Sequence, residues 1–238
     1  MSSLNLLFQR QYQINDKINV LIPTVGEIID QEDSYYSLVS LLTAMPIDLM
    51  VQLDDAGIDF AEINEYDLFL LLFPGIKASD TRLVFGDLDL GNFVMAQNNQ
   101  NDMVVLWDEK NDIVIDRAIH GQIASTLRKI HHLEKNMRKP ANEDGKKYMI
   151  KRAREKQKRQ KNRLQDSQLE SLIVAMVNAP QYKYDFEGTR GLSIYQFNES
   201  VRQVIKKVDY DNKMFGVYTG NINAKDLSQD DLNWLSHK

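Results

Sequence analysis

Polar and apolar residues alternate along residues 11–22, in the stretch QYQINDKINVLI. A period of two is typical of half-buried strands, and Asn15-Asp16 in its middle is a pair that favours a tight turn. We therefore expect a β-hairpin, which ends at Pro23 because proline cannot continue the ladder of hydrogen bonds.

The next two apolar stretches have the spacing of helices. Residues 34–45 place their apolar side chains on one helical face behind Ser34, a residue type that caps helix N-termini. Residues 46–57 carry Pro46 in the first turn and Gly57 just past the end, where proline and glycine are favoured. The pattern predicts two short helices in succession.

A third helix is expected over residues 60–73. Asp59 and Glu62 are three residues apart just before the apolar run, which resembles a capping box. Pro74-Gly75 follows the run and should stop the helix.

The spacing of apolar side chains then returns to the period of two that is typical of strands. Residues 82–97, 103–107 and 112–116 are rich in β-branched and aromatic side chains and are separated by polar turn sequences. This arrangement predicts an antiparallel meander. Asp116 can cap a following helix over residues 117–137, whose isoleucines and leucines fall on one side.

Two further helices are expected after the break at residues 138–145. Residues 146–178 contain neither proline nor glycine, which predicts one helix of roughly 50 Å. Its second half has a buried apolar stripe, whereas no apolar residue lies between Ala153 and Leu164, so we expect the first half to project into solvent. Residues 192–208 form the last helix, and Trp234-Leu235 should anchor the chain end.

These elements predict an α+β fold. Short helices and a β meander form an α+β domain over residues 1–138, a linker and an exposed basic helix cover residues 139–163, and a helical domain covers residues 164–238.

Charge is distributed very unevenly along the chain. The 238 residues have a net charge of −5, but residues 1–127 carry −14, residues 128–163 carry +11, and residues 164–238 carry −2. The chain has no cysteine, which excludes disulfides and thiolate metal sites. No stretch has the length of a signal peptide's apolar region or of a membrane helix, so we expect a soluble, intracellular protein that binds no membrane.

Candidate catalytic and metal-binding residues are few. His120 and His131 share a helical face but lie roughly 16 Å apart along the axis, and His131 with Glu134 gives too few ligands for a metal. Asp87 and Asp89 have the spacing of a magnesium pair, although the same alternation is ordinary for a half-exposed strand. Motifs for nucleophilic, phosphate-loop or dinucleotide chemistry do not occur. We expect no catalytic residue, metal or cofactor.

The basic segment is the candidate binding site, and three interpretations remain open for it. Its cations could neutralise phosphates of a nucleic acid, dock on an acidic protein surface such as the first half of a neighbouring copy, or keep a connecting helix hydrated. The residues concerned are Lys151, Arg152, Arg154, Lys156, Lys158, Arg159, Lys161 and Arg163.

Several sequence segments together resemble those of a known family. They are PTVGEI from Pro23, DDAGIDF from Asp54, LESLIVAMVN after the basic segment, LSIYQFNESVRQV, and the ending GNINAKDLSQDDLNWL with Gly220, Lys225, Asp231 and Trp234. The combination is similar to proteins from the structural modules of tailed bacteriophages of Gram-positive hosts.

The resemblance implies a non-enzymatic role in phage tail morphogenesis. Such a protein would be a tail assembly chaperone or a minor virion component, acting in the host cytoplasm during assembly or staying in the virion. Its partners would be tape-measure or tube subunits, and the resemblance points to no particular binding residue. A nucleic-acid-binding accessory protein is the alternative.

Overall fold

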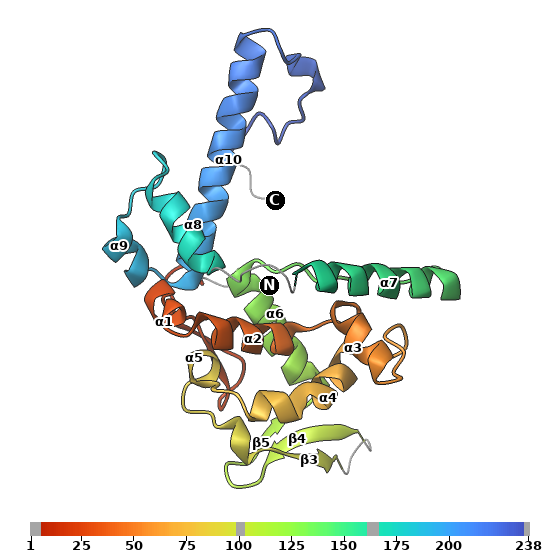
Figure 1. Ribbon diagram of the computed structural model, residues 1–238. Coiled ribbons are helices and arrows are strands. Elements are labelled where there is room, and N and C mark those ends of the chain that lie inside the picture. The colour runs from red at the N-terminus through yellow and green to blue at the C-terminus, as the bar shows by residue number, and fades with distance from the viewer. Residues whose placement is uncertain (1–5, 99–102, 161–166, 236–238) are drawn as a thin grey trace.

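The computed structural model describes residues 6–98, 103–160 and 167–235 (Figure 1). Within these residues the chain forms ten α-helices and two small antiparallel sheets, one of two strands and one of three. The predicted α+β fold class is confirmed.

The N-terminal hairpin is formed as predicted. β1 (Gln11–Gln13) pairs antiparallel with β2 (Asn19–Leu21). The Asn15 side chain holds the turn, since its carbonyl oxygen accepts from the amides of Lys17 and Ile18. Alternate residues in and next to the second strand enter the core, namely Ile18, Val20 and Ile22.

The first two helices begin differently from the prediction. α1 (Val25–Ile29) was not expected, and it starts with a capping box between Thr24 and Glu27. α2 (Glu32–Thr43) starts before Ser34, so the predicted cap at Ser34 is wrong. The Ser34 hydroxyl lies inside the first turn and donates to the carbonyl of Gln31.

The next predicted helix is split into two pieces. Pro46–Leu49 form a short 3-10 helix (η1), and α3 (Met50–Asp55) follows directly. Gly57 has a φ of +71°, a conformation that glycine adopts without a steric penalty, and it stands just past the helix end as predicted.

α4 (Glu65–Lys77) begins later and ends later than predicted. Asn64 caps it, whereas the Asp59 carboxylate accepts from the amide of Ala61 in the preceding turn. Pro74 lies inside the helix and does not end it. The turn beyond the proline is held because Ile76 is fully buried and Lys77 Nζ donates to the carbonyl of Phe93.

The meander is confirmed, but it is shorter than predicted. Residues 82–93 are mainly helical, with α5 (Arg82–Phe85) and the 3-10 helix η2 (Leu90–Asn92). Their alternating apolar residues are explained by burial of Val84, Phe85 and Leu90 in the core. The antiparallel strands, in spatial order, are β3 (Val94–Gln97), β4 (Val104–Asp108) and β5 (Ile113–Ile115).

α6 (Arg117–His131) is capped by Asp116, as predicted, through the amide of Ile119. It ends earlier than expected, because His132 adopts the left-handed conformation that terminates helices. An irregular segment follows up to residue 142.

The single helix expected over residues 146–178 is wrong. α7 (Glu143–Gln160) and α8 (Gln168–Val177) are separate helices and run in different directions (Figure 1). Ser167 has ψ of 118°, which no helix interior allows, and its hydroxyl caps α8. The Glu32 carboxylate ties this cap to α2, 2.5 Å from Ser167 Oγ and 3.1 Å from the amide of Leu169.

The last part of the chain contains α9 (Phe186–Gly191), α10 (Ile194–Tyr218) and the 3-10 helix η3 (Ala224–Asp226). A bridge between Thr24 and Ser193 joins the start of α10 to the start of α1. Trp234 lies beside α10, with its ring 5.9 Å from Lys207 Nζ, and Leu235 is exposed, so the predicted anchoring of both residues in a core is wrong.

One hydrophobic core reaches across the predicted domain boundaries. Ile173 on α8 and Phe197 on α10 are buried in the same cluster as residues of the N-terminal helices. The division into residues 1–138, 139–163 and 164–238 stays a prediction. This shared core positions the two longest helices. α10 extends away from it, and α7 lies along one side (Figure 1).

Candidate functional site

The basic helix α7 is docked on the N-terminal part of the chain along one face. Ile150 is buried in a small apolar cluster, and Met149 packs beside it. This contact contradicts the prediction that the basic half projects freely into solvent. The cluster is formed by Ile47, Leu53, Phe60, Leu68 and Ile150.

Ion pairs hold the same face on both sides of Ile150. Lys146 Nζ lies 2.7 Å from the Asp59 carboxylate, and the guanidinium of Arg154 lies 2.7 Å from Asp54 and 2.6 Å from Asp55. The hydrogen bond to Asp59 raises the pKa of Lys146, and the bond to Asp55 raises the pKa of Arg154. Residues 146, 150 and 154 are four apart and so share one helical face.

Of the remaining cations of α7, Lys147, Lys151 and Lys158 flank the docked face and line a pocket beside it, whereas Arg152, Lys156 and Arg159 point away from it. All are exposed, and none forms an ion pair with a residue that the structure describes. The guanidinium of Arg152 lies 5.8 Å from the centre of the exposed Tyr148 ring. We call this surface the outer face of α7; it comprises Lys151, Arg152, Lys156, Lys158 and Arg159.

The structure thus divides the binding residues predicted from the sequence into those on the docked face, those on the outer face and those outside the described residues. Arg154 belongs to the docked face and is matched within its own chain, while Lys161 and Arg163 lie outside the described residues. Lys147 and Tyr148, which border the outer face, were not predicted from the sequence. The four-residue spacing from Lys146 through Ile150 to Arg154 was the signal that could have identified the docked face.

A shallow pocket of about 410 Å³ lies where α7 meets α3. Its floor includes Ile150, and lysines line much of its wall. Such a hollow can receive an apolar side chain together with carboxylate groups, because the ammonium groups surround an apolar patch. The lining consists of Asp54, Lys147, Ile150, Lys151, Arg154, Glu155 and Lys158.

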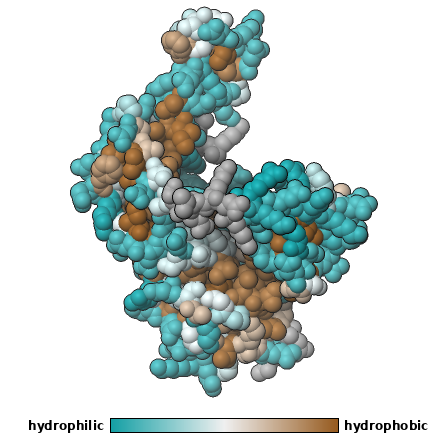
Figure 2. Space-filling view, viewed as in Figure 1, coloured by the Kyte–Doolittle hydropathy of each residue, from teal (hydrophilic) through white to brown (hydrophobic). Residues whose placement is uncertain are grey.

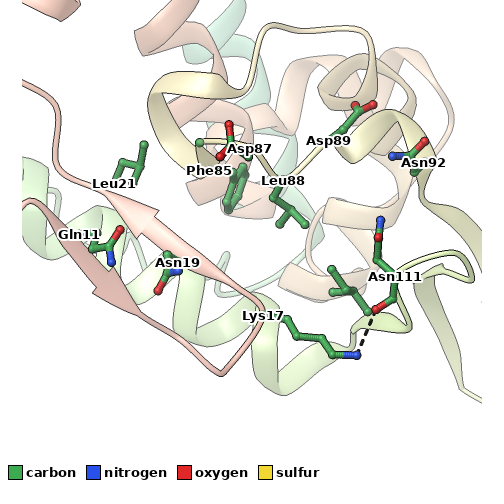
Figure 3. A pocket seen from close by; sticks show the side chains of 12 residues that line it. Gln11, Lys17, Asn19, Leu21, Phe85, Asp87, Leu88, Asp89, Asn92 and Asn111 are labelled. Carbon is green, nitrogen blue, oxygen red and sulfur yellow. Dashed lines mark hydrogen bonds between the residues drawn. The ribbon is translucent and has the colours of Figure 1, made fainter.

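A second pocket, of about 630 Å³, lies between the N-terminal hairpin and the loop around η2 (Figure 3). Lys17 closes one end, where its ammonium donates to the carbonyls of Asn111 and Asp112 at 3.0 and 2.5 Å. Amide side chains supply most of the other polar groups, including Gln11, Asn19 and Asn92.

Asp87 and Asp89 line this pocket but do not form the strand pair considered from the sequence. They lie in the loop before η2, at separate places on the rim (Figure 3). Asp89 accepts from the amide of Gly91 at 2.8 Å and thus caps η2. Over residues 6–98, 103–160 and 167–235, no three histidine or acidic side chains are placed to hold a metal ion.

His120 and His131 are packing residues. The His120 ring stacks on Phe69 with 4.1 Å between ring centres, and burial lowers its pKa to about 4. His131 Nε2 lies 2.9 Å from the hydroxyl of Tyr35, and burial lowers the pKa of His131 to about 4 as well. Both imidazoles are therefore neutral at pH 7.

We found no match to the chain among protein-family models, curated proteins or solved structures. None of the helices in the described part of the chain is both long enough and apolar enough to cross a membrane.

Proposed function

We propose that the protein is a non-enzymatic binding protein of phage tail morphogenesis, which uses the outer face of α7 to hold an acidic surface of a tape-measure or tube subunit. The observation that carries the proposal is the division of α7 into two faces. One face is fixed by Ile150 and by the ion pairs of Lys146 and Arg154, and the other presents cations that form no ion pair with the residues that the structure describes.

This arrangement suits recognition of a folded or helical protein partner. Lys151 and Arg159 are eight residues apart, so the outer face spans roughly 12 Å of helix. Because α7 is docked, its backbone is already ordered, and binding costs less conformational entropy than it would for a free arm. Opposite charge on the partner would speed association and select against basic surfaces.

A protein partner fits better than a nucleic acid. Glu155 lies among the cations, and α7 rests on the part of the chain that carries −14; this negative charge opposes the closely spaced phosphates of a nucleic acid more than the sparser carboxylates of a protein surface. The one observation that favours nucleic acid is Tyr148, which is exposed beside Arg152 and could stack on a base.

Co-expression with tape-measure and tube subunits, followed by affinity capture, tests the proposal. The variant R152E/K156E/R159E should lose at least about tenfold in retained partner, as expected when several charge contacts are reversed. The matched control K110E/K183E/K225E makes the same charge change at exposed lysines away from α7 and should retain the partner. Equal retention by both variants, or no retention by the wild type, would contradict the proposal.

A gel-shift assay tests the alternative function, which is nucleic-acid binding. A nucleic-acid-binding protein would shift single- or double-stranded DNA or RNA with an affinity that falls steeply as salt rises. The Tyr148→Ala variant would then weaken binding to single strands, whereas capture of a tail protein would be little affected.

A further inference from the structure

The pocket between the N-terminal hairpin and the loop around η2 lies apart from the basic helix (Figure 3). Its volume of about 630 Å³ falls within the range of roughly 300 to 1,000 Å³ that small-molecule sites occupy. None of the described residues that line it belongs to α7. A ligand in this pocket therefore does not depend on the function proposed for the outer face of α7.

Side-chain amides on opposite sides of the pocket have free hydrogen-bonding capacity. Gln11 and Asn19 lie on the hairpin, and Asn92 lies across from them at the end of η2 (Figure 3). None of these three side chains forms a hydrogen bond with a residue that the structure describes. Each carboxamide offers two N–H donors and an oxygen acceptor. The pocket thus presents both donors and acceptors to a ligand from both sides.

Apolar groups lie between the two polar sides. Leu21 and Leu88 are half-buried, and Ile113 is buried. Figure 3 shows Leu88 between the hairpin and Asn111. Gly86 keeps the middle of the pocket open, because an added Cβ would stand 3.4 Å from Leu21 Cδ1 and because its φ of +62° favours glycine.

The charges of the lining disfavour an anionic ligand. Asp87 accepts no hydrogen bond from a described residue, and Asp89 uses one carboxylate oxygen to cap η2. Lys17 is the only cation among the described residues that line the pocket. Its three N–H groups donate to the carbonyls of Asn111 and Asp112 and to the Asp112 carboxylate. No donor of this ammonium group is left to hold a phosphate or a carboxylate.

Three other ligand classes fit the lining poorly. A wholly apolar ligand would remove water from the amides without replacing its hydrogen bonds, which is costly. A flat aromatic ring gains most by stacking on an exposed aromatic side chain, but Phe85, the aromatic residue of the lining, is only 4% exposed. A compact cation would need converging carboxylates, whereas Asp87 and Asp89 stand at separate places on the rim (Figure 3).

We propose that the pocket binds a neutral saccharide. A sugar ring carries hydroxyl groups around its edge and C–H groups on its faces. Its hydroxyls can bond to the amides on the two sides of the pocket, while one face packs on Leu21 and Leu88. A hydroxyl donates and accepts at once, as a carboxamide does, and Asp87 can accept from a further hydroxyl. The dissociation constant should be in roughly the millimolar range, because exchanging a hydrogen bond with water for one with a ligand contributes little.

Saturation-transfer NMR on the full chain tests the site, because this method detects weak ligands. The probes are maltotetraose, cellotetraose, mannotetraose and chitotetraose, each at roughly 1 to 10 mM. At least one should receive saturation, and Gln11→Ala/Asn92→Ala should lower its affinity by at least about fivefold, as the loss of two hydrogen bonds predicts. Both side chains are exposed and unbonded, so their removal leaves the fold intact. Absence of transfer to all four probes would overturn the proposal.

The matched control locates the site. Gln52→Ala/Gln122→Ala also removes two exposed amides, one on α3 and one on α6, and should bind the saccharide as the wild type does. Equal losses of affinity in the two double variants would show that binding occurs elsewhere and would overturn the assignment to this pocket.

Asp87→Asn distinguishes a saccharide from a cationic ligand. The asparagine oxygen still accepts from a hydroxyl, so saccharide affinity should change by less than about twofold and should not depend on salt. Arginine amide is the cationic probe. If it binds more tightly than every saccharide, and if high salt and Asp87→Asn both abolish its binding, the pocket is a site for basic side chains and the saccharide assignment is overturned.

Discussion

The ammonium group of Lys146 lies 2.7 Å from the carboxylate of Asp59, which is 87 residues earlier in the chain. Arg154 makes the corresponding contact with Asp54 and Asp55 two turns later in α7. Three long-range ion pairs and one apolar contact at Ile150 thus hold a helix whose other face is cationic. Because the charges are partly exposed, this attachment should weaken as salt screens them.

The first prediction concerns this electrostatic attachment. Asp59→Asn should raise amide hydrogen exchange in the first turns of α7 several-fold, since Lys146 loses the partner that raises its pKa. Added salt should do the same in the wild type. Hydrogen exchange with mass spectrometry measures both effects. Asp80→Asn, which removes a surface ion pair with Arg82, is the control and should leave exchange of α7 unchanged.

A second prediction concerns the apolar contact. Ile150→Ala should lower the free energy of unfolding of α7 or of the whole chain by about 2 kcal/mol, the low end for a buried isoleucine because the site lies at the edge of a small cluster. Tyr148→Ala, on the exposed side of the same helix, should change it by less than about 0.5 kcal/mol. Denaturant unfolding compares them, and similar losses in both variants would contradict the docked face.

The elements that the sequence predicted well are those in which local signals and burial agree. Asn15 makes the hairpin turn, Asp116 caps α6, and the three strands form a meander. Asn15 and Asp116 each bond to their own neighbouring backbone, and the strands of the meander pair with their neighbours in the sequence, so the nearby sequence contains most of the information.

The predictions that failed mostly concern elements whose structure depends on contacts between residues far apart in the sequence. Ser167 and Glu170 have the spacing of a capping box, and the amide of Glu170 donates to Ser167 Oγ, but this local signal was missed because neither proline nor glycine marks the break before it. Glu32 of α2 adds a contact to the same cap that the nearby sequence does not reveal. Pro74 is tolerated inside α4 because burial of Ile76 holds the following turn. The docked face of α7 likewise depends on acidic partners about 90 to 100 residues away, so its charges looked uniformly exposed from the sequence.

A third prediction follows from the buried imidazole of His120, whose pKa is lowered to about 4 from 6.5. The unfolded chain binds the proton more tightly, so acid favours unfolding. The contribution of neutral His120 is complete above pH 6.5 and is lost as the pH falls from 6.5 to 4. The loss should reach about 3 kcal/mol.

Unfolding in denaturant across pH 4 to 7 measures this loss. His120→Gln should have a flatter pH profile than the wild type over this window, even though the variant is less stable at pH 7. His131 and His132, whose pKa values burial also lowers, contribute to the slope that remains. An unchanged profile in His120→Gln would contradict the assignment of the pH dependence to this ring.

The last prediction concerns Gly216, over which the end of the chain folds back. A methyl group there would stand 2.6 Å from Cδ1 and 2.8 Å from Cγ1 of Ile222, so Gly216→Ala should push Ile222 off the helix. The amides of Asn221 and Ile222 both donate to the Gly216 carbonyl, and these bonds should be lost with it. Trp234 should then become more exposed, which a red shift of its fluorescence would report.

Adding Ile222→Ala removes the clash and should restore the wild-type spectrum, whereas a spectrum that stays shifted would show that helix propensity, not this contact, controls the chain end. Gly121→Ala in α6, where an added Cβ meets no atom within 4 Å, is the control for a glycine replaced in a helix and should leave Trp234 unaffected.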